Sequence, residues 1–412
     1  MLALAWANLL HGKTRAAISV LAVGLGIMLM LISKGLANGS IAEVAERMQS
    51  VDAELVILPA QDNIIFTNSA PFPLGLQRFI EKQADDAGTL AAAVIPVFFG
   101  QIHMGGQQQR LFGVDPAQME LFLGKRKILA GKVFDRAVEF ARRLEDPATE
   151  LPDSDAPEAV YNEFLDPGLE LVIDERLQRV GRIDERTGAH VPYALGDEIK
   201  VMGRPFRIVG VVEAGVAGRV FAPLQVLREI ALAGERKASM FFVKLRPGAD
   251  PVYSADRLAA ALGSAARVEL KSDYGALLHE SFAQVDMYMN ASSGLALVVC
   301  FLFILLTMYT IVIQRTREIG ILKALGVTRF DLLRMSIYEA LLISVAGVSV
   351  GIGLSYFARW GLLAVKPLLT VALTPDLLLL AVAVGVLGGV LSALYPGYRA
   401  ARLDPALALS YE

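Results

Sequence analysis

The chain has 412 residues, of which 54% are hydrophobic and 20% are charged, and its formal net charge is −3. Soluble domains carry about a quarter of charged residues, so this composition excludes a disordered chain and disfavours a wholly soluble enzyme. The small negative net charge excludes a general attraction to nucleic acid. The single cysteine, Cys300, excludes an intrachain disulfide framework and a cysteine-rich metal site. The composition therefore predicts a membrane protein.

The first predicted elements are a cytoplasmic amphipathic leader over residues 1–15 and a membrane span over residues 16–33. A cleaved signal peptide is the alternative to the first span. The apolar region of a signal peptide is usually only about 7–15 residues long, and the apolar run in this chain is longer. A spanning helix needs roughly 17–25 apolar residues. Three further stretches meet this requirement: residues 286–313, 335–358 and 376–398.

Basic residues lie on one side of these spans. They precede the first span, follow the fourth, and occur five times in the loop 314–334, whereas the outer loop 359–375 has only two. Because short cytoplasmic loops are enriched in Lys and Arg, both termini and the loop 314–334 are predicted to be cytoplasmic, and residues 34–285 to lie outside. Glu339 is the only acidic residue inside a span; it is expected at the interface or paired with Arg334 or Arg315, with a proton relay as the alternative.

Residues 34–285 regain charges and turn signals, which indicates a large extracytoplasmic domain. Strands and helices alternate there, which favours an α/β or α+β fold. The predicted strands cover residues 54–58, 94–103, 110–114, 169–173, 198–202, 206–212 and 240–245, and the helices residues 76–84, 133–144, 224–232 and 253–262. The acidic, proline-containing stretch 145–158 is predicted to be a solvated loop, because it lacks the ordered ligand spacing of a calcium site.

Apolar residues recur between Tyr274 and Asn290 at the spacing of a helix face: Leu278, Phe282, Val285 and Met289. We therefore expect an amphipathic helix that runs without a break into the second span and acts as a rigid lever.

Motifs for catalysis are incomplete. His279-Glu280 begins like a zinc-protease motif, but Ala283 stands where the second histidine is required. Gly12-Lys13-Thr14 ends like a phosphate-binding loop, but Ala7 replaces its first glycine and no strand precedes it. We expect no catalytic, cofactor-binding or metal-binding residue in this chain, and no ATP hydrolysis by the chain alone.

The cytoplasmic segment 314–334 contains a short amphipathic helix. Ile319, Leu322 and Leu325 are predicted to share one face, and Gly326 is placed to end the helix. Arg317, Glu318 and Lys323 supply polar contacts around that face. Five basic residues forbid burial in lipid, so the segment is expected to dock on a cytoplasmic protein, or else to lie flat on the membrane.

Several segments resemble one known family. RTREIGILKALGVTR (residues 315–329) closely resembles the coupling segment of FtsX-like permeases, the membrane subunits of the MacB-type ABC transporter superfamily. The C-terminal YPGYRAARLDPALALSYE (395–412) and the leader WANLLHGKTRAAISVLAVGLGI (6–27) are similar to that family's end and start. Gly113-Val114-Asp115-Pro116 and LGDEIKVMGRPFRIVGVVE (195–213) resemble its periplasmic core domain, whereas residues 131–168 look like an insertion.

The resemblance implies four transmembrane α-helices with a large α/β (α+β) extracytoplasmic domain between spans one and two. That domain would have a membrane-proximal part, residues 34–98 and 235–285, and an inserted subdomain, residues 99–234. The resemblance also implies an interface with an ATPase on the coupling helix, formed by Arg317, Glu318, Ile319, Leu322, Lys323, Leu325 and Gly326.

The implied function is that of an ABC transporter permease in the bacterial cytoplasmic (inner) membrane. It would couple ATP hydrolysis by a separate ATPase dimer, which holds the ATP and Mg²⁺, to movement of its extracytoplasmic domain. Lipoproteins, lipids, peptides or hydrophobic drugs would be exported or extracted. The implied partners are a second permease chain (identical or paralogous), a periplasmic adaptor or lipoprotein, and membrane lipids. The alternative is a signalling subunit that controls a cell-wall hydrolase; a membrane enzyme lacks any site.

Glycines recur four residues apart in the last two spans, at Gly347 and Gly351 and at Gly385 and Gly389. Such spacing permits close approach of helices. We expect packing within this chain, with a contact between two permease chains as the alternative.

Overall fold

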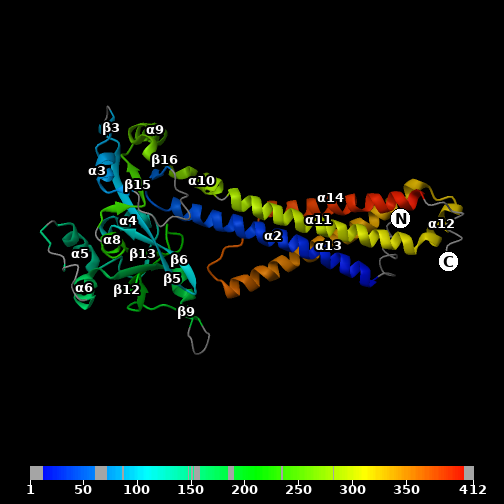
Figure 1. Cartoon of the computed structure of the whole chain (residues 1–412), viewed down its shortest axis with the longest axis horizontal. Coiled ribbons are helices and arrows are strands. Elements are labelled where there is room, and N and C mark those ends of the chain that lie inside the picture. Colours follow the sequence, from blue (N-terminus) through cyan, green and yellow to red (C-terminus); the bar gives the residue numbers. More distant parts are fainter. Residues whose placement is uncertain are drawn as a thin grey trace. The chain divides into compact units, whose positions relative to one another are not determined.

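The computed structural model describes residues 13–60, 72–85, 88–146, 148–149, 152, 158–183, 190–232, 235–281 and 283–402 (Figure 1). Predictions about the leader before Lys13, the acidic loop around Ser154 and the tail after Arg402 lie outside these residues. The chain divides into two compact units, Met1–Ser40 with Ala283–Glu412, and Ile41–Phe282. Each unit is described separately below.

Four long helices dominate the first unit and confirm the four predicted spans: α2 (Lys13–Gln49), α11 (Ala283–Gln314), α13 (Arg329–Val365) and α14 (Pro375–Arg402). Each is long and apolar enough to cross a bilayer. A short helix, α12 (Thr316–Ala324), follows α11 and precedes α13. Helix α2 continues well beyond residue 33, because the polar sequence that follows the span keeps residues with good helix propensity such as Ala, Glu and Arg.

The glycines singled out in the sequence lie where these helices approach one another. A Cβ on Gly351 would lie 2.8 Å from the carbonyl oxygen of Gly24 in α2, and one on Gly347 would lie 2.6 Å from the Cβ of Val23. A Cβ on Gly385 or Gly389 of α14 would collide with a side chain of α13, at 2.3 Å from Val348 and 1.6 Å from Ser344. The four glycines therefore face other helices of the same chain at distances that leave no room for a side chain.

The second unit is built on one ten-stranded mixed sheet with the order β11-β12-β8-β13-β6-β5-β15-β1-β16, in which β7 also pairs with β12. The β12–β8 and β13–β6 pairs are parallel and the other pairs are antiparallel. The strands are β1 (Leu55–Pro59), β5 (Ala91–Met104), β6 (Gln107–Val114), β7 (Ile128–Gly131), β8 (Glu170–Asp174), β11 (Glu198–Val201), β12 (Arg204–Val212), β13 (Val220–Pro223), β15 (Met240–Leu245) and β16 (Ala266–Leu270).

Short helices cover this sheet, and three two-stranded sheets lie beside it. The helices are α3 (Gly75–Glu81), α4 (Met119–Leu123), α5 (Arg136–Glu145), α6 (Glu158–Leu165), α7 (Glu175–Val180), α8 (Leu224–Leu232), α9 (Pro251–Leu262) and α10 (Tyr274–Ser281). The small sheets pair β2 (Phe72–Pro73) with β14 (Lys237–Ala238), β3 (Ala84–Asp85) with β4 (Gly88–Thr89), and β9 (Arg182–Ile183) with β10 (His190–Val191).

Strand β1 shows why both faces of the sheet are covered. Leu55 and Ile57 point to one face and belong to an apolar cluster that also contains residues of α3 and α9. Val56 and Leu58 point to the opposite face and join a cluster with residues of α2, α4 and α10. Successive side chains of a strand alternate between faces, so a run of apolar residues without polar interruption is buried on both.

All seven predicted strands and all four predicted helices of this unit are confirmed, with shifts of a few residues at their ends. The sequence did not predict strands β7, β13 and β16 of the large sheet, the six strands of the small sheets, or the helices α4, α6 and α7, which are all short. Strand β5 changes its neighbour along its length: residues 91–97 pair with β15 and residues 98–104 with β6. The division into parts 34–98 with 235–285, and 99–234, stays a prediction.

The predicted lever between Tyr274 and residue 313 corresponds to α10 and α11. Phe282, between them, and the side chain of Val285 lie outside the described residues, so the continuity of this lever also stays a prediction. Helix α2, by contrast, is one uninterrupted helix that supplies residues up to Ser40 to the first unit and residues from Ile41 to the second.

Candidate functional site

The coupling segment between α11 and α13 has defined ends. Gly326 follows α12 with a φ of +95°, and the Val327 N–H donates to the carbonyl of Leu322 at 3.1 Å, which ends the helix as predicted. Thr328 then opens α13 with a capping box: its side chain accepts from the Asp331 N–H, and the Asp331 carboxylate accepts from the Thr328 N–H. The chain therefore turns sharply between two capped helices.

Ile319, Leu322 and Leu325, which were predicted to share one face, differ in their exposure, and their role as an ATPase interface stays a prediction. Ile319 and Leu322 are half-buried and line a small cavity of about 70 Å³, whose other lining residues include Ile311, Leu332, Met335 and Ala400 of α11, α13 and α14. Leu325 lies beyond the end of α12 and is 77% exposed. The helix stops one residue before Leu325, so this residue leaves the face that packs on the other helices.

The apolar residues that the segment does expose are Ile321, Leu325 and Phe330, of which Phe330 is 78% exposed. We call these three residues the apolar knob. Only Leu325 was singled out as a site residue from the sequence. The exposure of Phe330 depends on where α13 begins, and the apolar spacing within α12 carries no information about that.

Polar side chains make contacts at both ends of α12. Arg315, just before the helix, lies 3.6 Å from Glu318 (Nε to Oε2) and 4.0 Å from the buried Glu339 of α13 (Nη1 to Oε1). The second distance confirms one of the two expected partners of Glu339. Lys323 donates from Nζ to the carbonyl of Ala401 at 2.9 Å; a cation is favourable there because the last carbonyls of α14 have no helical partner. Arg317 is exposed.

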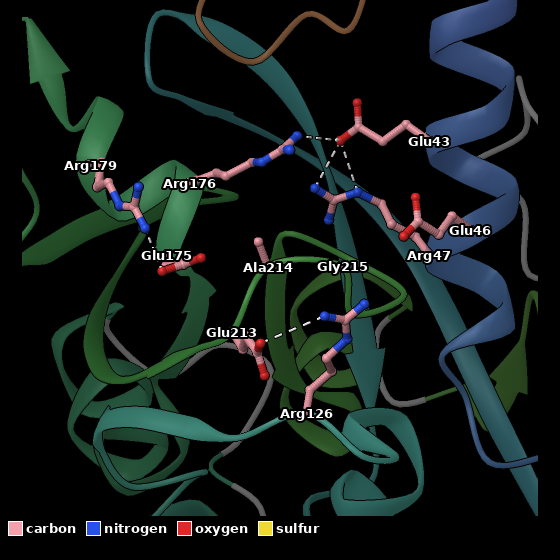
Figure 2. A pocket seen from close by; sticks show the side chains of 10 residues that line it. All are labelled: Glu43, Glu46, Arg47, Arg126, Glu175, Arg176, Arg179, Glu213, Ala214 and Gly215. Carbon is pink, nitrogen blue, oxygen red and sulfur yellow. Dashed lines mark hydrogen bonds and ion pairs between the residues drawn. The ribbon is translucent and has the colours of Figure 1, made fainter.

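A second site, which the sequence did not predict, is a cavity of about 430 Å³ in the other unit (Figure 2). Its walls come from α2, from α7 and from two loops, and its lining consists almost wholly of arginine and glutamate: Glu43, Glu46, Arg47, Arg126, Glu175, Arg176, Arg179, Glu213, Ala214 and Gly215. The lining residues come from segments that are far apart in sequence. The local signals among them are the i, i+4 pairs Glu43–Arg47 and Glu175–Arg179.

The floor of this cavity is an ion-pair network at the end of α2. Arg47 bonds to Glu43 at 2.9 Å and to Asp174 at 3.2 Å, and Arg219 bonds to the same Glu43 oxygen at 2.6 Å. Asp174 is fully buried and also caps α7 by accepting from the Leu177 N–H at 2.8 Å. Burial raises the pKa of the Asp174 carboxyl from its ordinary value, and Arg47 opposes that shift. The network fixes the end of α2 to the strand ends of this unit.

Within the described part of the chain, no group of three or more His, Cys, Asp or Glu side chains is arranged to hold a metal ion.

Two family descriptions match the chain. The MacB-like periplasmic core domain matches residues 16–261, and the FtsX-like permease C-terminal region matches residues 290–405. The macrolide export ATP-binding/permease protein MacB of Bdellovibrio bacteriovorus is 29% identical over 237 residues, which cover 53% of this chain and 36% of the relative. The MacB of Escherichia coli O157:H7 is 28% identical over 238 residues, 54% of this chain and 36% of the relative. The alignments thus span little more than a third of these relatives' length.

Two solved structures are similar in part. The periplasmic region of MacB from Actinobacillus actinomycetemcomitans aligns with a TM-score of 0.36 and 12% identity, over 56% of this chain and 95% of that one. The extracellular domain of the noncanonic ABC-type transporter YknZ from Gram-positive bacteria aligns with a TM-score of 0.31 and 18% identity, over 53% and 98%. Since the two family descriptions together cover the apolar helices and most of the mixed sheet, the chain belongs to the FtsX-like permeases with a MacB-like periplasmic core domain, an inner-membrane family.

Proposed function

We propose that this chain is the permease subunit of an ABC transporter and couples ATP hydrolysis by a separate ATPase to movement of its extracytoplasmic domain. The observation that carries the proposal is the apolar knob on the coupling segment. Leu325 and Phe330 are more than three-quarters exposed, yet charged residues flank them on both sides. Apolar side chains grouped on an otherwise charged loop are typical of a protein-binding surface.

The chemistry of the knob favours a protein groove over lipid. Burial of a Leu or Phe side chain contributes about 1.5–3 kcal/mol, so burial of Leu325 and Phe330 together would contribute about 3–6 kcal/mol to docking. Protein interfaces usually have an apolar centre that is depleted of charged residues and a polar rim, which is the composition that exposed Leu and Phe side chains among charged neighbours would supply. The ATPase subunit, as a dimer holding ATP and Mg²⁺, is the partner we assign to this surface. A second permease chain completes the transporter.

Two anchors would pass a movement of α12 to the spans. The Arg315–Glu339 pair joins the start of α12 to α13, and the Lys323 contact joins its end to the last carbonyls of α14. Helix α2 then supplies a continuous connection into the ectodomain, where Glu43 and Arg47 are held by Asp174 and Arg219. We therefore assign the lever to α2, alongside the second-span helix expected from the sequence.

The transported molecule belongs to the class of lipoproteins, lipids, peptides or hydrophobic drugs. Support comes from the relatives described as macrolide export proteins. The direction, export or extraction, is part of the same proposal.

Co-purification of the ATPase with permease variants at matched expression tests the docking. Leu325→Asp and Phe330→Asp introduce a charge into the proposed groove and should reduce ATPase recovery at least about a hundredfold. Because both side chains are exposed in the isolated chain, neither change should lower its melting temperature. Leu129→Asp, at an exposed apolar site on strand β7, is the matched control and should leave recovery unchanged.

The alternative, that the coupling segment only lies on anionic lipid, predicts different results. In that case, neutralising Arg317 and Lys323 would release the segment from anionic vesicles, and Leu325→Asp and Phe330→Asp would both still co-purify with the ATPase. Undiminished recovery with Leu325→Asp and Phe330→Asp would overturn the docking proposal.

A further inference from the structure

The charged cavity of the ectodomain contains groups that its own ion pairs do not satisfy. Arg47 and Arg219 are engaged by hydrogen-bonded ion pairs with Glu43, and Arg179 by one with Glu175 at 2.6 Å. The floor is balanced, because Glu43 and Asp174 neutralise Arg47 and Arg219. Three other charged residues of the cavity, Arg176, Arg126 and Glu46, are not part of these hydrogen-bonded ion pairs.

Arg176 is the surplus cation. Its Nη1 lies 3.6 Å from Glu43 Oε1, the oxygen that Arg47 and Arg219 already contact at 2.9 and 2.6 Å. At 3.6 Å this is a charge contact without a hydrogen bond. The Arg176 side chain is 52% exposed and, in Figure 2, extends from α7 along the cavity. Its guanidinium donors are therefore accessible to an oxyanion.

Arg126 is held loosely in the same way, from a different wall. Its Nη1 lies 3.7 Å from Glu213 Oε1, again beyond hydrogen-bond distance. Its guanidinium lies against the loop at Gly215, whose φ is +94° and where a Cβ would lie 2.8 Å from Arg126 Nη2. The positive φ favours glycine at this position, and a glycine leaves room for the guanidinium beside the loop.

Glu46 is the surplus anion. It lies on α2, one turn from Glu43, and lines the cavity with an exposed side chain. Among the residues that the structure describes, no ion pair to Glu46 is formed. One unmatched carboxylate and two loosely held guanidiniums therefore face a single cavity.

We infer that this cavity binds a small zwitterion, with its oxyanion on Arg176 and Arg126 and its ammonium group facing Glu46. The cavity volume of about 430 Å³ falls within the about 300–1,000 Å³ usual for ligand sites. Ligand sites are commonly apolar, whereas this lining is charged, so an acyl chain or an apolar drug does not fit it. A short peptide and a phosphoethanolamine head group share the required chemistry. The inference concerns the ectodomain alone and does not depend on the ATPase partner.

Isothermal titration calorimetry on the full chain in a non-ionic detergent tests this inference. The probes are the tripeptide Lys-Gly-Glu and glycerophosphoethanolamine, and the uncharged, end-blocked tripeptide Gln-Gly-Gln is the negative probe. We expect at least one zwitterion to bind and the blocked tripeptide not to bind. Binding of the tripeptide alone assigns a peptide ligand, and binding of glycerophosphoethanolamine alone assigns a lipid head group.

Two cavity variants and two matched controls locate the site. Arg176→Gln and Glu46→Gln should each weaken binding about tenfold, as expected for loss of one charged hydrogen bond. Arg207→Gln and Glu198→Gln remove an exposed pair on β11 and β12 with the same long 3.7 Å contact, and should leave affinity unchanged. Absence of binding by both zwitterions, equal binding of the blocked tripeptide, or equal effects of cavity and control variants would each overturn the inference.

Discussion

Arg315 and Glu339 form an ion pair, with 4.0 Å between Nη1 and Oε1, where the coupling segment meets α13. The Glu339 side chain is only 6% exposed, and the residue lies inside a predicted span. A buried carboxylate without a cation costs several kcal/mol of desolvation, so the pair explains why a charge is tolerated at this position. The same pair attaches the start of α12 to a membrane helix.

Replacing Glu339 should therefore remove the interactions of this buried carboxylate and leave Arg315 paired with the exposed Glu318. We expect Glu339→Ala to lower the free energy of unfolding by about 1–3 kcal/mol, as for a buried group that loses its partner. Glu318→Ala is the matched control, because Glu318 contacts the same arginine but is 68% exposed; exposed pairs contribute about 0–1 kcal/mol. Thermal unfolding of the purified chain in detergent compares the two. Equal melting temperatures for both variants would contradict a stabilising role of the pair.

Local sequence patterns were sufficient to predict the long helices and most strands of the large sheet, but not the surfaces that could bind a partner or a ligand. The four spans follow from apolar length, and strand β12 follows from its apolar sequence before and after Gly210, because both signals lie in the hydropathy of neighbouring residues. The short β13, Val220–Pro223, was missed because four residues carry too little periodicity. Its strand state is decided by pairing with β6 and β8, which are distant in sequence.

The candidate sites depended still more on tertiary contacts. Ile319 and Leu325 were both predicted on one apolar face, but Ile319 packs against α11 and α13 and Leu325 is exposed. Glu43, Asp174 and Arg219 meet only because β8 and β13 are neighbours in the sheet and α2 ends beside them. No residue spacing in the sequence indicates that these three side chains come into contact, so the charged cavity could not be predicted.

Gly351 and Gly353 offer a test of helix packing within one helix. A Cβ at Gly351 would meet the Gly24 carbonyl oxygen at 2.8 Å and Ile27 at 2.8 Å, whereas none of the described atoms lies within 4 Å of one at Gly353. Gly351→Ala should lower the melting temperature, since overpacking costs about 1–3 kcal/mol. Gly353→Ala should be neutral or stabilise by about 0.5–1 kcal/mol through helix propensity. Equal melting temperatures for Gly351→Ala and Gly353→Ala would contradict the close helix packing at Gly351.

Tyr274 should make stability depend on pH in the alkaline range. Burial raises the pKa of its phenol to about 12, with Arg110 acting in the opposite direction. In the unfolded chain the phenol ionises near about pH 10, so stability is fully present below that pH and is lost as the pH rises toward 12. The wild type should therefore lose about 2 kcal/mol more than Tyr274→Phe between pH 9 and 12, because each pKa unit is worth about 1.4 kcal/mol and the folded phenol is itself half ionised at pH 12.

Denaturant unfolding of both proteins at several pH values gives this difference. Tyr253→Phe, at an exposed tyrosine, is the control and should follow the wild type. Parallel pH curves for the wild type and Tyr274→Phe would show that the buried phenol contributes nothing.

The predicted membrane orientation is tested with single cysteines. Cys300 is buried and donates to the Ala22 carbonyl at 3.3 Å, so a Cys300→Ser background removes the native thiol with a small change in volume. In this background Ser154→Cys, in the acidic stretch between the first two spans, should react with an impermeant maleimide on intact spheroplasts. Thr328→Cys, exposed on the coupling segment, should react only after permeabilisation. The physical reason is the basic loop 314–334, which the positive-inside rule keeps in the cytoplasm. Labelling of Thr328→Cys on intact spheroplasts would reverse the orientation and remove the coupling segment from reach of a cytoplasmic ATPase.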